Sequence, residues 1–300
     1  MAIPLGFLFS SDQGIPTAPT GPRNDSKFCK QPFTVLKAGD TMTITKNDSI
    51  AVFDSGVGGF SVLRHLQRLL PHEHYVYLGD CANAPYGCRT TEEVRALTLA
   101  AAEKLVQENH IKALVVACNT ATSAAISALR QTYPELIIIG IEPALKLAAD
   151  HFPGGRIGVM ATEVTLREEK FDALMHRFHS GCTVEKIPAP GLVELIEAGK
   201  LHAPETLALL TQILSPYLGK LDALVLGCTH YPFVAQAISQ VLGQEVALLD
   251  GGEGTARETR RRLAQAGLLL DSPTEGHTIL HNSAGDERLA KFYSEVMAHG

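Results

Sequence analysis

The 300-residue sequence lacks paired cysteines, long apolar runs and an excess of basic residues. None of its six cysteines forms a C-x-x-C pair, which excludes the common zinc and thioredoxin-like motifs and favours free thiols. The longest apolar run, Ala113 to Cys118, is far shorter than the roughly 20 residues that a membrane-spanning helix needs. The net charge of −6 gives no general attraction to nucleic acid or anionic lipid, although a local basic patch is compatible with that sum. We predict a cytoplasmic protein that acts on a small molecule and binds neither membrane nor nucleic acid directly.

The first 48 residues differ from the rest of the chain. They contain five prolines and scattered Gly, Ser and Thr, and they show no sustained apolar period of 2 or 3.6 residues. We interpret residues 1–48 as a flexible N-terminal extension. Met42, which lies close to the start of the ordered pattern, is a second candidate for the first residue.

From Ser49 onward, short β-rich apolar runs alternate with amphipathic segments. The predicted strands are Ile50–Phe53, Tyr75–Leu78, Ala113–Ala117, Ile137–Ile141, Ile157–Ala161, Ala223–Leu226 and Val246–Leu249. The predicted helices are Gly59–Leu70, Thr91–Glu108, Ala121–Tyr133, Thr165–Phe178, Pro204–Leu218 and Phe233–Leu242. This alternation predicts an α/β fold with parallel sheets covered on both faces, whose ligands collect at the carboxyl ends of the strands.

An internal repeat relates the two halves of the chain. A shift of 110 aligns Ala113–Thr120 with Ala223–His230, with four of eight positions identical and Cys118 matched to Cys228. A shift of 107 aligns the runs that begin at Ile50 and Ile157. We therefore predict two parallel-sheet domains related by a pseudo-two-fold axis, with the active site in the cleft between them. The predicted boundaries are 49–142 plus 251–300 for one domain and 143–250 for the other.

The matched cysteines suggest a reaction that needs two opposed proton carriers. A single cysteine at a strand end is more often a small buried hydrophobe, but two that face one cleft can invert a carbon bearing a hydrogen. One thiolate removes the proton from one face, and the opposite thiol delivers a proton to the other face. Both cysteines precede predicted helices, whose N-termini would lower the thiol pKa. The same helix termini, with the hydroxyls of Ser55, Thr120, Thr162 and Thr229, offer donors for the carboxylates of an acidic amino acid.

Four short segments, which follow one another in a fixed order along the chain, resemble those of the glutamate racemase family. They are Phe53–Gly59 (FDSGVGG), Pro85–Gly87 (PYG), Val116–Ala121 (VACNTA) and Gly227–Pro232 (GCTHYP). The resemblance runs from about Ile50 to about Asp286 and does not cover residues 1–48. It implies a cofactor-independent isomerase that uses neither pyridoxal phosphate nor metal and supplies D-glutamate for peptidoglycan. It also implies that Cys118 deprotonates D-glutamate and that Cys228 deprotonates L-glutamate.

The resemblance further implies roles for residues around the two thiols. Asp54 and His230 match residues that assist the thiols, and Asp80 and Glu197 match further acids, with Glu194 one helical turn away as the alternative to Glu197. The residues that match substrate-binding positions are Asp54, Ser55, Pro85, Tyr86, Gly87, Cys118, Asn119, Thr120, Thr162, Thr165, Cys228, Thr229 and His230. Cys29, Cys81, Cys88 and Cys182 match no catalytic position, and we interpret them as structural.

Three other functions remain open at this point. The first is racemisation of another amino acid such as aspartate, because paired thiols are shared across the superfamily. The second is a hydrolase in which Cys228 is the nucleophile and His230 the base. The third is a non-catalytic member that binds a protein partner, since some members of the family inhibit DNA gyrase. A homodimer is compatible with each of these functions.

Overall fold

The computed structural model describes residues 43–167 and 181–298. Most of the predicted extension, Met42, Cys29 and the second part of the helix predicted over Thr165–Phe178 lie outside the described residues. Of the extension, only 43–48 are described, and they form an irregular segment and a turn before the first strand. No helix among the described residues is long and apolar enough to cross a membrane.

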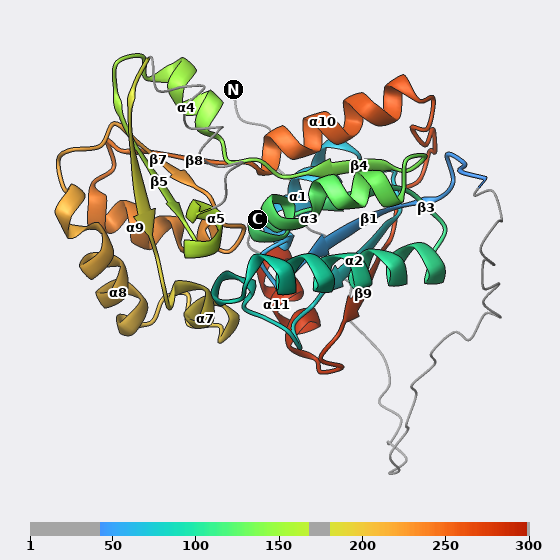
Figure 1. The fold of residues 1–300 in the computed structure, drawn as a ribbon, viewed down its shortest axis with the longest axis horizontal. Coiled ribbons are helices and arrows are strands. Elements are labelled where there is room, and N and C mark those ends of the chain that lie inside the picture. The colour runs from blue at the N-terminus through green and yellow to red at the C-terminus, as the bar shows by residue number, and fades with distance from the viewer. Residues whose placement is uncertain (1–42, 168–180, 299–300) are drawn as a thin grey trace, which may run out of the picture. The chain divides into compact units, whose positions relative to one another are not determined.

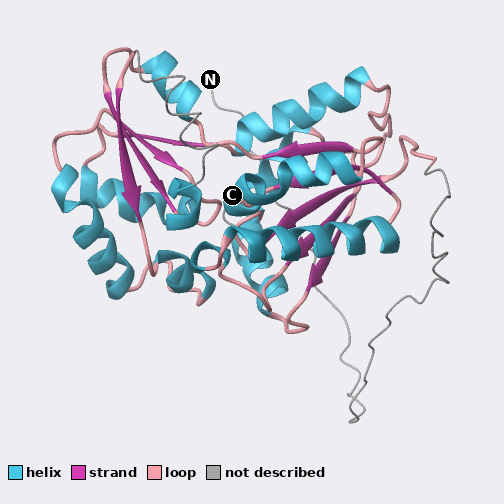
Figure 2. Ribbon diagram, viewed as in Figure 1, coloured by secondary structure: helices cyan, strands magenta, loops and turns pink. Residues whose placement is uncertain are grey.

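The described strands form two parallel sheets, drawn as two groups of magenta arrows in Figure 2. The first sheet has the order β4-β3-β1-β2-β9. Its strands are β1 (Ser49–Asp54), β2 (Tyr75–Gly79), β3 (Ile111–Val116), β4 (Ile137–Gly140) and β9 (Thr278–Asn282). The second sheet has the order β6-β5-β7-β8. Its strands are β5 (Arg156–Ala161), β6 (Thr183–Pro188), β7 (Ala223–Leu226) and β8 (Ala247–Asp250).

Helices cover both faces of each sheet (Figure 1). Those associated with the first sheet are α1 (Phe60–Leu69), α2 (Thr91–Glu108), α3 (Asn119–Thr132), α10 (Gly252–Gln265) and α11 (Arg288–Ala298). Those associated with the second sheet are α4 (Leu145–His151), α5 (Glu163–Arg167), α7 (Leu192–Glu197), α8 (Pro204–Leu214) and α9 (Ala235–Leu242). Short 3-10 turns are η1 (Tyr86–Cys88), η2 (Ser215–Tyr217) and η3 (Tyr231–Val234).

Strand β1 illustrates why both faces of the first sheet are packed against helices. Ile50 and Val52 belong to a core cluster that includes buried residues of α1, α10 and α11. Ala51 and Phe53, which point to the opposite face, belong to a second cluster with α2 and α3. A strand buried on both faces reads as a continuous apolar run, which is the pattern that the sequence shows.

The internal repeat of the sequence is reflected in the structure, because the two sheets have the same strand order and the same pairing register. The order β4-β3-β1-β2 in the first sheet corresponds to β8-β7-β5-β6 in the second. Ile50 pairs with Ala113 in the first sheet, and their repeat equivalents Ile157 and Ala223 pair in the second. The predicted fold class, two parallel-sheet α/β units, is confirmed. The exact domain boundaries stay a prediction; the first sheet takes its strands from 49–140 and 278–282, and the second from 156–250.

Among the described residues, two strands and four helices were not predicted from the sequence. Strands β6 and β9 are edge strands that are only partly buried, and their sequences TVEKIP and TILHN lack a long apolar run. Since an edge strand is covered less completely than a central one, polar residues are tolerated there. The missed helices are α4, α7, α10 and α11. Among them, α10 begins Gly-Glu-Gly and carries a run of arginines, so its apolar stripe is narrow.

Candidate active site

Polar residues from the two sheets meet at the carboxyl ends of their central strands. Asp54, the last residue of β1, accepts a hydrogen bond from the hydroxyl of Thr229, which follows β7, at 3.0 Å. The backbone N–H of Val57 donates to Oε1 of Glu197, the last residue of α7, at 2.9 Å. These partners are 175 and 140 residues apart in the chain, so only the packing of the two sheets brings them together.

Cys118 is the N-cap residue of α3 and is buried. Its Sγ accepts a hydrogen bond from the N–H of Ala121 at 3.4 Å, and its thiol donates to the Ser55 hydroxyl at 3.6 Å. Burial and, to a smaller extent, the charge of Asp54 raise the pKa of the Cys118 thiol to about 12, although both hydrogen bonds oppose the rise. The sequence predicts a lowered pKa at this helix terminus. That prediction is wrong for Cys118, because desolvation outweighs the helix terminus.

Cys228 has a different neighbour. Its Sγ lies 3.6 Å from Nδ1 of His230, and both side chains are buried. The chain continues into η3, whose N-cap is His230, so Cys228 caps no helix. The expectation that both thiols lie at helix N-termini therefore holds for Cys118 only. Beside Cys228, the neighbouring group is the imidazole of His230 instead of a helix N-terminus.

His230 joins the second thiol to a carboxylate. Its Nε2 lies 2.6 Å from Oε1 of Glu197. Burial by itself lowers the pKa of His230, but hydrogen bonding and electrostatic interaction with Cys228 and Glu197 outweigh burial and raise that pKa well above its usual value. Burial likewise raises the pKa of Glu197, yet the hydrogen bond and charge of His230 lower it overall. The pair is therefore an imidazolium and a carboxylate, and Glu197 rather than Glu194 makes the contact.

Asp54 lies between the two thiol sites and is fully buried. It accepts hydrogen bonds from the N–H of Gly56 at 2.9 Å and from Thr229. Burial raises the pKa of the Asp54 carboxyl, against the opposing effect of the positive charge of His230. Asp54 thus interacts electrostatically with Cys118 on one side and with His230 on the other.

The glycines after β1 allow this close packing. A Cβ placed on Gly56 would lie 1.8 Å from Oε1 of Glu197, and a Cβ on Gly58 would lie 2.5 Å from Nδ1 of His230. Real Cβ atoms are not found so close to other atoms, so side chains at these two positions would displace the imidazole and carboxylate. The loop therefore needs glycine so that the backbone can approach His230 and Glu197.

A cluster of hydroxyls lies beside Cys118. The Oγ1 atoms of Thr120, Thr162 and Thr165 lie 3.0 to 3.2 Å from one another, and all three residues are buried. Next to Thr120 in the chain, the buried Oδ1 of Asn119 has no hydrogen-bond partner within the described part of the chain. A buried acceptor without a partner is costly, so Asn119 is suited to accept a hydrogen bond from a bound ligand.

The remaining predicted residues lie on the loop after β2. Asp80 is buried and accepts a hydrogen bond from the Tyr86 hydroxyl at 2.7 Å. Burial raises the pKa of Tyr86, and its hydrogen bond to Asp80 raises it further. A Cβ on Gly87 would lie 2.8 Å from Cγ2 of Thr162, which brings the loop from Pro85 to Gly87 against the end of β5.

Two tyrosines near the thiols were not predicted from the sequence. Tyr77 in β2 donates from its hydroxyl to the carbonyl of Gly56 at 2.7 Å and so fixes the glycine loop. Tyr231, in the GCTHYP segment, is fully buried. Its pKa is raised by burial and by the charge of Cys228. Both tyrosines lie in apolar surroundings, and only their contacts distinguish them from core residues. Nowhere in 43–167 or 181–298 do three or more His, Cys, Asp or Glu side chains form a group that could hold a metal ion.

Comparison with known proteins identifies the family. The family model described as Asp/Glu/Hydantoin racemase matches residues 57–259. The chain belongs to the Asp/Glu/hydantoin racemase family. Within this family, a glutamate racemase of Clostridium botulinum is 45% identical over 253 residues, which are 84% of this chain and 98% of the relative. The predicted resemblance to glutamate racemase and the predicted isomerase class are confirmed.

Solved structures of the family agree with this assignment. A glutamate racemase of Bacillus anthracis superposes with a TM-score of 0.77 at 32% identity, covering 85% of this chain and 95% of its own. The Escherichia coli glutamate racemase superposes with a TM-score of 0.74, also at 32% identity, covering 84% of this chain and 94% of its own. The latter structure is a complex with L-glutamate and the activator UDP-MurNAc-Ala.

Proposed function

We propose that this chain is a glutamate racemase that interconverts L- and D-glutamate with Cys118 and Cys228 as the two proton carriers. The observation that carries the proposal is the position of the two cysteines. They follow equivalent strands, β3 and β7, of two sheets with equal order and register, and the chemical surroundings of the two thiols differ. Family relatives named glutamate racemase, one of them in complex with L-glutamate, support the choice of substrate.

In the proposed reaction, one sulfur takes the proton from Cα and the other returns one to the opposite face. Starting from L-glutamate, the Cys228 thiolate removes the Cα proton and leaves a carbanion, to which the Cys118 thiol donates its proton. His230 holds the proton that Cys228 gives up before the reaction, because Glu197 stabilises the imidazolium at 2.6 Å. The high pKa of Cys118 suits its role as the donor in this direction. The reverse reaction exchanges the two roles.

The substrate is held by the polar groups around Cys118. The hydroxyls of Thr120, Thr162 and Thr165 bind one carboxylate, and the unpaired Oδ1 of Asn119 accepts a hydrogen bond from the ammonium. The remaining predicted substrate contacts are Ser55, Pro85, Tyr86, Gly87 and Thr229. Asp54 and Asp80 are the other acidic residues proposed for the site, in addition to Glu197. The resemblance implies that no cofactor is needed and that the product serves cytoplasmic peptidoglycan synthesis.

The decisive experiment is racemisation of L-glutamate by the purified full chain without added cofactor, followed by circular dichroism. We expect Cys118→Ala and Cys228→Ala each to lose at least about 10³-fold in turnover, the contribution expected of a positioned acid or base. Cys182→Ala is the matched control, since Cys182 is also buried, and we expect it to retain activity within about twofold. Racemisation that persists in both active-site variants would exclude the proposal.

The same experiment in deuterium oxide separates the alternatives. A racemase places solvent deuterium at Cα of the product, because the donating thiol exchanges with water. A Cys228 hydrolase would instead form an acyl-enzyme and leave Cα unlabelled. Turnover of L-aspartate in place of L-glutamate would indicate another racemase of the family. No turnover of any amino acid would favour the non-catalytic function.

A further inference from the structure

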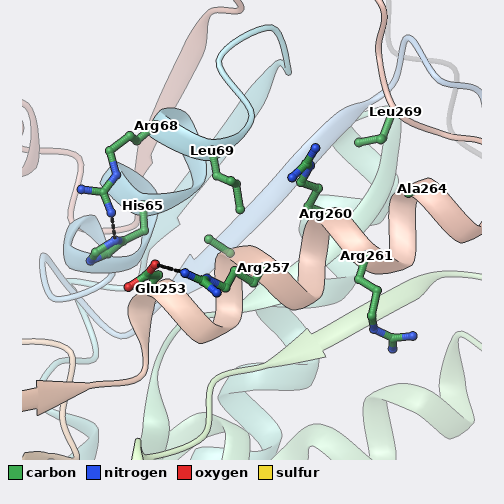
Figure 3. Close-up of a pocket in the computed structure, with 10 residues that line it drawn as sticks. His65, Arg68, Leu69, Glu253, Arg257, Arg260, Arg261, Ala264 and Leu269 are labelled. Carbon is green, nitrogen blue, oxygen red and sulfur yellow. Dashed lines mark hydrogen bonds and ion pairs between the residues drawn. The ribbon is translucent and has the colours of Figure 1, made fainter. Parts of the chain in front are cut away.

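Charged side chains in the groove between α1 and α10, outside the thiol site, interact with one another (Figure 3). Arg257 forms an ion pair with Glu253 at 2.7 Å, and Arg68 contacts the imidazole of His65 at 3.2 Å. The hydrogen bond and charge of Arg257 lower the pKa of Glu253, and the charge of Arg68 adds to this effect. Arg257 and Glu253 are exposed, so water can satisfy any contact that they lack. A polar atom that is buried without a partner is therefore more informative.

Four buried side-chain oxygen atoms have no hydrogen-bond partner within the described part of the chain. One of them, Oε2 of Glu73, is compensated by its ion pair with Lys112. Another belongs to Gln67, whose amide nitrogen makes two hydrogen bonds. The third, Oδ1 of Asn119, is the acceptor proposed for the substrate ammonium. The fourth is the hydroxyl of Tyr231, a fully buried residue, and nothing in the proposed reaction uses it so far.

The internal repeat shows which contact is missing beside Cys228. The shift of 110 aligns Tyr231 with Ala121, and each of them lies three residues after its cysteine. In the first half of the chain, the N–H of Ala121 donates to Sγ of Cys118 at 3.4 Å. In the second half, the N–H of Tyr231 donates instead to the carbonyl of Cys228 at 3.1 Å. The sulfur of Cys228 therefore lacks the backbone donor that its repeat equivalent has.

The side chain of Tyr231 can supply that donor. Burial raises the pKa of Tyr231 well above its usual value, and the charges of Cys228 and Glu194 and hydrogen bonding with Cys228 raise it further. The phenol therefore keeps its proton. In the structure the hydroxyl and the sulfur do not complete a hydrogen bond. A neutral thiol is a weak acceptor and a thiolate is a stronger one, so the hydroxyl gains a partner when Cys228 passes its proton to His230.

We infer that the Tyr231 hydroxyl is a second hydrogen-bond donor to the sulfur of Cys228 and stabilises the thiolate alongside the imidazolium of His230. The inference rests on the proposed function, because it assigns Tyr231 to one of the two proton carriers. Tyr231 is a positioning residue: the proton of Cys228 passes to Nδ1 of His230, and the phenol keeps its own. Its hydroxyl takes the role that the N–H of Ala121 has beside Cys118.

The test is alkylation of the full chain with iodoacetamide, followed for each cysteine by peptide mass spectrometry. Tyr231→Phe keeps the ring and removes only the donor. We expect the pH profile of Cys228 alkylation to move up by about one pH unit, the effect of about one hydrogen bond to a charged group. Because a more basic thiolate is also more nucleophilic, the rate at the acidic end should fall by only about threefold. Cys118 in the same molecule should react within about twofold of its original rate.

Two further measurements separate this role from a structural one. The acidic limb of the kcat/KM profile for racemisation should move up by about one pH unit, because less thiolate is present at low pH. The midpoint of urea unfolding should not fall, because removing an unpartnered hydroxyl leaves no other buried group unsatisfied.

Tyr75→Phe is the matched control. Tyr75 is also buried, but it begins β2, and its hydroxyl donates to the carbonyl of Leu70 at 2.9 Å. This variant should show the opposite result. Its urea midpoint should fall, because the carbonyl of Leu70 loses its donor, while alkylation of Cys228 and racemisation stay within about twofold of the unmodified chain.

Three results would overturn the inference. They are an unshifted alkylation profile of Cys228 in Tyr231→Phe, equal slowing of Cys118 and Cys228, and a loss of stability that parallels the loss of activity. The first would show that the hydroxyl does not act on the sulfur, and the other two that Tyr231 acts through packing. Alkylation requires no substrate turnover, so failure of this inference and failure of the proposed function can be told apart.

Discussion

His230 Nε2 lies 2.6 Å from Oε1 of Glu197, and on its other side His230 Nδ1 lies 3.6 Å from the sulfur of Cys228. The imidazole thereby connects a thiol that follows β7 to a carboxylate at the end of α7. Cys118, the repeat equivalent of Cys228, has Ser55 and a backbone N–H in place of this imidazole. Both halves of the chain therefore contain the thiol, but only Cys228 has an imidazole beside it that can accept its proton.

Removing the carboxylate should change the pH dependence of activity. In Glu197→Gln, His230 loses a negative neighbour that raises its pKa, so the imidazolium should deprotonate at lower pH. We expect the alkaline limb of the kcat/KM profile to move down by about one pH unit. Glu194→Gln, one turn earlier on α7, should leave the limb in place. Equal profiles for the two variants would show that Glu197 does not act through His230.

The same ion pair should stabilise the fold in a defined pH range. The pKa of His230 is raised in the folded state, so its contribution is complete below the unfolded pKa of about 6.5 and is lost as pH rises through the folded pKa. Urea unfolding of the wild type and His230→Asn should therefore show the largest difference near pH 6 and a shrinking one toward pH 10. A difference independent of pH would mean that packing alone accounts for the effect.

Cys118 should react slowly with iodoacetamide at neutral pH and faster after Asp54→Asn. Burial and the charge of Asp54 raise the pKa of this thiol, so removing the charge increases the thiolate fraction. We expect a rate increase of about threefold to tenfold at pH 8.5, measured by peptide mass spectrometry. Asp80→Asn is the control, because the charge of Asp80 does not contribute to the raised pKa of Cys118. Equal rates in both variants would contradict the electrostatic role of Asp54.

A methyl group on the glycine loop should disable the site. In Gly56→Ala the new Cβ would meet Oε1 of Glu197, so we expect activity to fall by at least about a hundredfold and stability by about 1 to 3 kcal/mol. Gly254→Ala is the matched control, because a Cβ there has open space on α10. It should keep full activity and gain up to about 1 kcal/mol from helix propensity. Activity assays and urea unfolding of the two variants test this contrast.

A buried ion pair lies at the opposite end of the first sheet. Lys112 Nζ lies 2.5 Å from Oε2 of Glu73, and both side chains are almost completely buried. Lys112→Met leaves the carboxylate of Glu73 unpaired, so we expect a loss of about 3 to 5 kcal/mol in urea unfolding. Adding Glu73→Gln should recover part of that loss. A double variant as unstable as the sum of the single variants would show that the pair is not coupled.

The sequence by itself determined the α/β class, the central strands and the two thiols. A strand that is buried on both faces has a continuous apolar sequence, which can be recognised without a structure. The internal repeat places a cysteine at the end of the equivalent strand in each half of the chain. Cys118 and Cys228 could therefore be found without coordinates. The racemase family followed from short segments such as GCTHYP, because those residues are contiguous in the chain.

Only the tertiary structure decided the contacts between distant segments. It placed Glu197 rather than Glu194 on His230, and it explained Gly56 by the approach of Glu197. It also reversed the expected pKa shift of Cys118, since burial depends on what packs over the helix terminus. The edge strands β6 and β9 were likewise not predictable from the sequence, because their burial depends on their place in the sheet. In each case the interaction joins residues that are far apart in sequence. A local sequence pattern does not indicate which distant residues will come into contact, so these features could not be predicted.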